Sequence, residues 1–235
     1  MKFLIFGCLV GASLIRPSAA AADSLTYTGL GSGAWVTLKL GGVTETGWAG
    51  EIKWTLNAGG VSTAVTTYCA DLFDDAKNIQ FGTLETTQAL DSNPSLSHGA
   101  LPNAGSKAAY LVNTNANTAH GSDTQAAGLQ IAIWQAMFGN TFTVLSSTSN
   151  YNAIMAAAAG YGVPVGVSSI ADYFDVTNSA ITGSGANGQD QVLVGTPEPR
   201  TILLMVFPVV GLLGYRRRFR QVAARVSVGR LAFRN

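Results

Sequence analysis

Apolar and polar residues alternate along much of the first half of the chain, and glycine-rich turns separate the alternating stretches. A period of two, rich in β-branched and aromatic residues, predicts β-strands. We expect strands over residues 34–40, 50–57 and 62–73. The same pattern returns near the end of the body, over residues 170–177 and 190–195.

The middle of the chain changes to a helical period. Residues 106–114, 123–138 and 151–162 predict helices, and Ser122 followed by Gln125 fits a capping box that marks the start of the second one. The combined pattern predicts an α+β fold. We expect a β-rich single domain, with strands arranged as a sandwich or a barrel and a helical middle segment.

One residue breaks the pattern of the helix predicted over 123–138. At 100° per residue, Gln130 lies in the middle of the apolar face, whereas Gln135 lies on the opposite side. A buried glutamine must satisfy its amide or cost about 1–3 kcal/mol. Gln130 therefore needs a partner in the core. The apolar face comprises Ala126, Leu129, Ile133, Trp134 and Met137.

The net charge of +1 hides an uneven distribution. Residues 23–195 carry 12 acidic side chains and 4 lysines, a net charge of −8 (4 minus 12), and they contain no arginine. Residues 196–235 carry 8 arginines and Glu198, a net charge of +7 (8 minus 1). Because binding to phosphates needs clustered basic side chains, the acidic body argues against nucleic acid as a partner.

The basic start of the chain predicts export. Residues 1–22 contain Lys2, an apolar run over 3–15 and then small residues that lead to Asp23. This is the layout of a secretory signal peptide with cleavage near Ala20 or Ala22. A membrane anchor is the alternative, but about 13 apolar residues fall short of the roughly 20 that span a bilayer.

Three features follow one another near the end of the chain. Pro197, Glu198 and Pro199 precede an apolar run over 202–214, and an arginine cluster follows at once. The positive-inside rule would hold that cluster in the cytoplasm, so an ordinary short tail anchor fits. The cluster comprises Arg216, Arg217, Arg218 and Arg220.

The order of these three features resembles the PEP-CTERM sorting signal of Gram-negative bacteria. The resemblance covers residues 196–220, and residues 221–235 form a basic tail beyond the point where such signals usually stop. It implies an exported protein that is anchored transiently in the inner membrane and processed by an exosortase near the Pro-Glu-Pro. The protein would then reside at the cell surface or in the extracellular matrix, among polysaccharide.

The mature body, residues 23–195, contains one cysteine, Cys69. A lone cysteine in an oxidising compartment is buried, paired with another molecule, or used in chemistry. Cys69 follows a predicted strand in "YCADL", and Gln130 opens "QIAIW". Together they resemble the Cys–Gln thioester domain of bacterial surface adhesins, although Leu129 replaces the usual threonine. The motif "TQAA" at residues 124–127 lacks the following Ile-Trp.

The resemblance implies an internal thioester between Cys69 and Gln130, shielded from water by Tyr68, Trp134 and Phe138. A thioester captures an amine or hydroxyl group of another surface once. We therefore expect a covalent adhesin rather than an enzyme, with no cofactor. Two unreactive roles remain open: Cys69 as a small buried apolar residue, and Gln130 as a partner of a backbone. The protein would then be a structural or polysaccharide-associated matrix protein.

A secreted hydrolase is a third possibility, with Cys69 activated by His98 or His120. Both histidines lie in polar loops without an orienting motif, and paired carboxylates in a glycosidase motif are absent from the sequence. A short acidic run follows Cys69, but its spacing is not that of an EF-hand loop. We predict a solvated turn there and no metal. The run comprises Asp71, Asp74 and Asp75.

Overall fold

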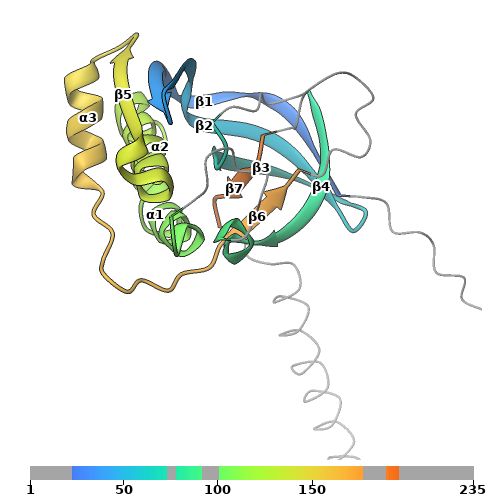
Figure 1. Ribbon diagram of the computed structural model, residues 1–235. Helices are drawn as coiled ribbons and strands as arrows, with labels where there is room; N and C mark the ends of the chain where they lie inside the picture. The colour runs from blue at the N-terminus through green and yellow to red at the C-terminus, as the bar shows by residue number, and fades with distance from the viewer. Residues whose placement is uncertain (1–22, 73–77, 92–100, 177–188, 196–235) are drawn as a thin grey trace, which may run out of the picture. The chain divides into compact units, whose positions relative to one another are not determined.

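The computed structural model describes residues 23–72, 78–91, 101–176 and 189–195. Contacts divide the chain at Gly195, and every helix and strand described below precedes that residue. Figure 1 labels these elements. The strands are β1 (Asp23–Leu40), β2 (Val43–Ala58), β3 (Val61–Cys69), β4 (Ile79–Thr86), β5 (Phe142–Ser147), β6 (Asp172–Asp175) and β7 (Gln191–Leu193). The helices are α1 (Ala104–Ala119), α2 (Asp123–Phe138) and α3 (Tyr151–Gly160), with 3-10 turns η1 (Thr87–Asp91) and η2 (Gly139–Thr141).

The strands form one antiparallel sheet in the order β2-β3-β7-β6-β4-β1-β5, and β2 also pairs with β1. That extra pairing closes a ring of six strands. The two ends of the long strand β1 pair with different neighbours in addition to β2. Its first residues pair with β4, from Asp23 to Thr26, and its last residues pair with β5, from Val36 to Leu40. The fold is a β-rich α+β domain, as the sequence predicts.

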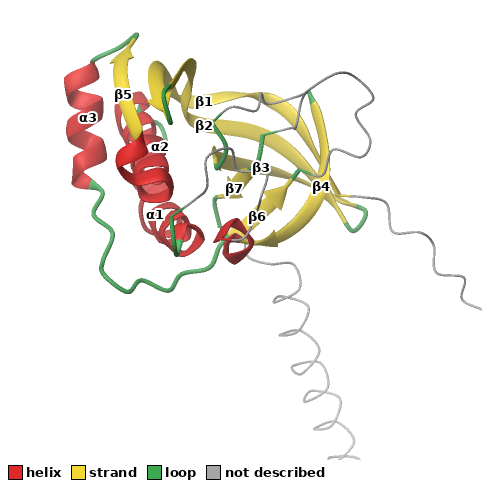
Figure 2. Ribbon diagram, in the orientation of Figure 1, coloured by secondary structure: helices red, strands yellow, loops and turns green. Residues whose placement is uncertain are grey.

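The helices gather on one side of the strands, as Figure 2 shows. Two hydrophobic cores follow from this arrangement. The smaller core fills the ring of strands and includes Leu25, Trp54 and Phe174. The larger core lies between the sheet and the helices, and it contains Tyr68, Cys69 and Trp134.

Helix α2 is the central helix of the larger core. It begins at Ser122, whose side chain accepts a hydrogen bond from the Gln125 N–H, as the sequence predicts. The Gln125 side chain does not return to the cap; its Oε1 instead accepts a hydrogen bond from the Tyr161 hydroxyl, at 2.7 Å. The helix packs so closely on α3 that a Cβ at Gly128 would lie 2.7 Å from the Ala157 Cβ. Burial on both sides explains why apolar residues extend well beyond one face.

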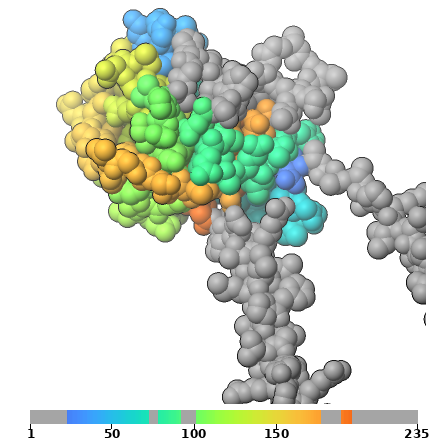
Figure 3. Space-filling model, turned by 60° about the horizontal axis from the view of Figure 1, so that its bottom comes forward, coloured from blue at the N-terminus to red at the C-terminus, as the bar shows by residue number. Residues whose placement is uncertain are grey.

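The segment that joins α3 to β6 crosses the surface beside α1, and Figure 3 shows it in orange. The Asn113 side chain on α1 donates a hydrogen bond to the Ile170 carbonyl, at 3.0 Å. The backbone N–H of Thr87 then donates to the Ala171 carbonyl, also at 3.0 Å, where β6 begins. These contacts tie the helical layer to the edge of the ring.

Sequence patterns found most of these elements but not all. The predicted strands over 34–40, 50–57 and 62–73 lie within or around β1, β2 and β3, and the predicted helix over 123–138 coincides with α2. Neither β4 nor β5 was expected. In β4 the apolar pattern is inverted, because the buried positions are Gln80 and Gly82 whereas Ile79 and Phe81 are exposed, and β5 has only two buried residues, Phe142 and Val144.

Candidate functional site: Cys69 and Gln130

The structure brings Cys69 and Gln130, 61 residues apart in sequence, into direct contact. The Cys69 N–H donates to Gln130 Oε1 at 2.8 Å, and Gln130 Nε2 donates to the Cys69 carbonyl at 2.9 Å. Both side chains are buried. We call this pair of hydrogen bonds the Gln130 clasp. The sequence predicts that a buried Gln130 needs a polar partner in the core. The clasp provides it, because both the oxygen and the nitrogen of the amide are hydrogen-bonded.

The clasp takes the place of a missing strand. Strand β2 pairs with β3 as far as Ile52 and Thr67, and beyond that point β2 pairs with β1 alone. Backbone groups alternate in direction along a strand, so the N–H and C=O of Cys69 point to the side that β2 has left. A buried backbone pair without partners would be costly. The primary amide of Gln130 supplies one donor and one acceptor there, as a strand would.

The sulfur of Cys69 has its own surroundings. The thiol donates a hydrogen bond to the Asp71 carbonyl. Burial, chiefly, and the nearby Asp71 and Asp190 charges raise the pKa of the Cys69 thiol well above its usual value. The hydrogen bond to Asp71 and the Trp134 indole act in the opposite direction on this pKa but do not outweigh burial. The thiol is therefore protonated near neutral pH.

A buried carboxylate, Asp190, stands beside this site. One oxygen of Asp190 accepts the Tyr173 hydroxyl at 2.6 Å, and the other accepts the Val176 N–H at 2.9 Å. Its backbone carbonyl accepts the Ala70 N–H, next to Cys69. Sequence analysis did not single out Asp190 or Tyr173. In the sequence, Asp190 is visible only as an acidic residue immediately before a short strand. Many residues at such positions are exposed to solvent, so the pattern does not indicate burial.

The three aromatic residues expected to shield the site lie in the same core, in different places. Trp134 is 2% exposed. Its indole N–H meets the geometric limits of a hydrogen bond with no described residue, but it lies close enough to the Cys69 sulfur to act toward a lower pKa of that thiol. Tyr68 is fully buried, its hydroxyl lies in the field of Glu51 and Tyr161, and that hydroxyl has no hydrogen-bond partner among the described residues. Phe138 is buried one turn beyond Trp134. Trp134 is therefore the member of this set that acts on the Cys69 sulfur.

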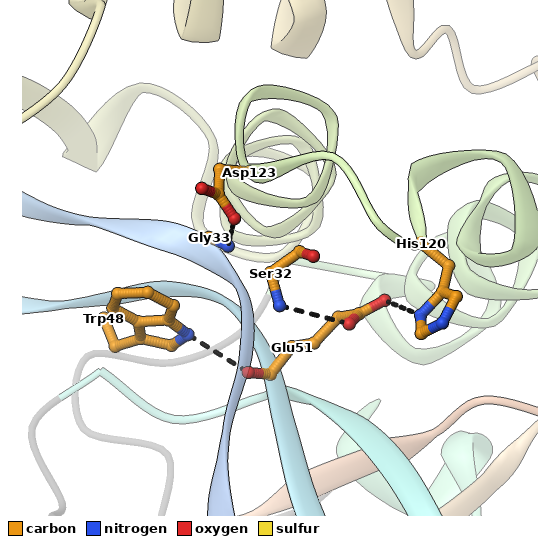
Figure 4. A network of polar contacts seen from close by, with 6 residues as sticks. All are labelled: Ser32, Gly33, Trp48, Glu51, His120 and Asp123. Atoms are coloured by element: carbon orange, nitrogen blue, oxygen red, sulfur yellow. Dashed lines mark hydrogen bonds and ion pairs between the residues drawn. The ribbon is translucent and has the colours of Figure 1, made fainter.

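A second polar network lies between β1, β2 and the start of α2, and Figure 4 shows it. Glu51, only 2% exposed, accepts the Ser32 N–H at 3.2 Å and contacts His120 Nδ1 at 2.8 Å. Asp123 accepts the Gly33 N–H at 3.1 Å. The register of β1 against β2 shifts between Leu30 and Gly33, and this irregularity turns the two N–H groups toward the carboxylates.

This network places His120 away from Cys69. The imidazole is paired with Glu51 at the end of α1, and no hydrogen bond joins it to Cys69 among the described residues. His98 lies outside the described residues. The prediction of a solvated acidic turn was wrong for Asp71, which is 2% exposed, because the chain turns inward after β3. Asp74 and Asp75 lie outside the described residues, and no cluster of three metal-ligating side chains occurs in the described part of the chain.

The predicted sorting signal lies outside the described residues. This concerns the signal peptide, the apolar run near the C-terminus, Pro197, Glu198, Pro199, Arg216, Arg217 and Arg218. Within the described part of the chain, none of the helices has the length and apolar character needed to cross a membrane.

Comparison with known protein families finds no family that matches this chain. No curated protein is similar enough to match it. Likewise, no solved structure matches the fold.

Proposed function

We propose that this chain is an exported cell-envelope or extracellular-matrix protein that attaches covalently to another surface through a thioester between Cys69 and Gln130. The observation that carries the proposal is the Gln130 clasp, which seats the only cysteine of residues 23–195 against the one glutamine in the apolar face of α2. The proposed export and exosortase sorting are supported by the two terminal signals of the sequence.

The clasp already supplies part of the chemistry. In thioester formation the Cys69 sulfur attacks the Gln130 amide carbon, the thiol proton passes to Nε2, and ammonia leaves as the carbon–nitrogen bond breaks. Negative charge develops on Oε1 as the sulfur attacks, before ammonia leaves, and the Cys69 N–H lies 2.8 Å from that oxygen. A backbone donor aimed at a developing oxyanion stabilises the transition state. The sulfur would first rotate away from the Asp71 carbonyl.

Burial suits such a bond once it has formed. Water is kept from the site because Cys69 is 1% exposed and Gln130 is fully buried. Exclusion of water slows hydrolysis of a reactive intermediate. Attack by an amine or hydroxyl group of a target, such as a surface polysaccharide, would transfer the Gln130 acyl group to that target and regenerate the Cys69 thiol.

A second candidate function has its own support. The clasp pairs every polar atom of the Gln130 amide with backbone, and burial holds the pKa of Cys69 high, which disfavours the nucleophilic thiolate. In this alternative the pair is a structural link between β3 and α2. The protein would then be a non-reactive, polysaccharide-associated matrix protein. A hydrolase is the least supported class, because among the described residues His120 bonds to Glu51 and makes no hydrogen bond to Cys69, the nucleophile that such an enzyme would need.

The deciding experiment is the intact mass of the exported protein, freshly purified and not denatured. We expect a mass that is lower, by one ammonia, than the mass calculated from the amino-acid composition. Methylamine should then react with the thioester, leaving an N-methylated glutamine at residue 130 and a free thiol at Cys69. Cys69→Ala and Gln130→Ala should abolish both signals. Gln125→Ala is the matched control, since Gln125 lies on the same helix in the "TQAA" motif but is bonded to Tyr161. A mass equal to the composition, with no methylamine adduct, would leave only the structural alternative.

A further inference from the structure

A hydroxyl-rich surface with two tryptophans lies on the outward side of β1, β2 and β5. Trp35 is 46% exposed, although it lies in the middle of a paired strand. The next outward residue along β1, Thr37, pairs with Thr46 on β2 and with Ser146 on β5. We call this surface the Trp35 face; it comprises Trp35, Thr37, Lys39, Thr46, Trp48 and Ser146.

The two tryptophans are held in place. Trp35 and Trp48 are cross-strand partners with ring centroids 5.7 Å apart and planes inclined by 73°. The Trp48 indole donates to the Glu51 carbonyl at 3.1 Å and lies so close to Gly33 that a Cβ there would be 2.8 Å from the ring. The carbonyl of Trp35 accepts the Thr148 N–H at 3.0 Å. The exposed ring of Trp35 therefore rests on a fixed backbone and a fixed neighbour, so binding to it would cost little ordering entropy.

We propose that the Trp35 face binds a neutral polysaccharide chain. The C–H bonds of a pyranose ring carry a partial positive charge that suits the negative face of an indole. The hydroxyl groups of Thr37 and Thr46, 3.3 Å apart, can each donate and accept hydrogen bonds, as sugar hydroxyl groups do. The residues of this face come from three neighbouring strands, so a linear polymer could contact all of them by lying across the strands.

Charge and composition favour this ligand over others. Residues 23–195 carry a net charge of −8, and Lys39 is the one charged side chain of the Trp35 face, so an acidic polymer would be repelled by the body as a whole. A protein partner would find mostly hydroxyl groups around the tryptophans. Tryptophan is enriched at protein interfaces as well, but the serine and threonine residues that make up half of this face are scarce among the residues that dominate the affinity of such interfaces. This inference rests on the proposed function in one respect: export brings the protein to a place where polysaccharide is present.

The test is native affinity electrophoresis of the exported protein in gels that contain a neutral polymer (hydroxyethyl cellulose, galactomannan or dextran) or the acidic polymer alginate. We expect at least one neutral polymer to retard the protein and alginate to have no effect. Trp35→Ala should raise the dissociation constant for the polymer about tenfold or more, as expected for the loss of a central aromatic contact. Trp35→Phe, which keeps an aromatic face, should retain most of the binding.

Phe81→Ala is the matched control, because Phe81 is an aromatic residue of β4 that is 38% exposed and lies outside the Trp35 face. It should bind as the parent protein does. Retardation by none of the neutral polymers, retardation that survives Trp35→Ala, or retardation by alginate alone would overturn the inference. Intact mass of Trp35→Ala separates the two proposals, since the ammonia loss depends on Cys69 and Gln130 whether or not the polymer binds.

Discussion

Replacing Gln130 by glutamate exchanges the amide NH2 group of the clasp for an oxygen and leaves the shape of the side chain almost unchanged. To isolate this contact from any thioester, the substitution is made in a Cys69→Ala background, which keeps the Cys69 backbone but removes the sulfur. A carboxylate at residue 130 can still accept the N–H of residue 69. Its second oxygen, however, would face the carbonyl that Nε2 now bonds at 2.9 Å, so two acceptors would meet in a buried site.

The expected magnitude follows from that geometry. Near pH 7 the variant loses one buried hydrogen bond and buries an uncompensated charge, which together cost about 3–5 kcal/mol of unfolding free energy. Total stabilities are about 5–15 kcal/mol, so the loss is large. Burial and the facing carbonyl raise the pKa of the new carboxyl above its unfolded value of about 4.3. A raised folded pKa means that the neutral form is the native one. Its stabilising contribution is therefore fully present below about pH 4.3 and is lost as the pH rises through the folded pKa.

Urea unfolding, followed by tryptophan fluorescence at several pH values, measures this effect. The gap in stability between Cys69→Ala/Gln130→Glu and Cys69→Ala should narrow to about 1 kcal/mol at low pH, where a protonated glutamate can donate to the carbonyl as the amide did. Gln135→Glu in the same background is the control; its side chain is exposed on the same helix, and the change should stay within about 0.5 kcal/mol. Equal, pH-independent effects at the two positions would refute the clasp.

Three further predictions concern other parts of the chain. Tyr68→Phe should be neutral or stabilise the protein by up to about 1–2 kcal/mol in urea unfolding, because the buried hydroxyl has no hydrogen-bond partner in the described part of the chain; a clear loss of stability would contradict this. Gly128→Ala should destabilise by about 1–2 kcal/mol, since its Cβ would lie 2.7 Å from Ala157, whereas Gly160→Ala meets open space and should not destabilise; equal thermal midpoints would contradict the close packing of α2 on α3. Protein recovered from an exosortase-containing host should begin between Ala21 and Asp23 and end near Pro197 to Arg200 by terminal sequencing and mass; recovery of the full-length chain would count against the proposed sorting.

The contact between Cys69 and Gln130 could be anticipated from the sequence, but its form could not. A glutamine amid apolar residues on a well-capped helix signals a buried polar partner, and the lone cysteine is a natural candidate. The sequence does not reveal that β2 leaves β3 after Thr67, which frees the backbone of Cys69 for the amide. That departure depends on the pairing of β2 with β1 at glycines 33 and 50, where side chains would clash.

Polar residues covered by a distant layer were the hardest to foresee. Glu51 alternates with Ile52 and Trp54 along β2, so a strand pattern places it on the opposite side, normally facing water. In the structure that side is covered by the helices, and Glu51 is buried against Ser32 and His120. Whether one side or both sides of a strand are buried depends on how the layers of the fold are stacked. The local alternation of residues along the strand carries no information on that stacking.

Strand β7 gives the fold a mechanical property. It is three residues long, it is the last strand before the C-terminal segment, and its residues pair with Thr67, Tyr68 and Cys69. If the C-terminal segment tethers the protein while residue 130 holds a target, tension enters at β7 and leaves through α2. Strand β7 pairs with β3 on one side and with β6 on the other, so the load on β7 is divided between two short pairings. Because β7 is the shortest described strand of the ring, we expect rupture under force to begin there and to open the ring between β3 and β6.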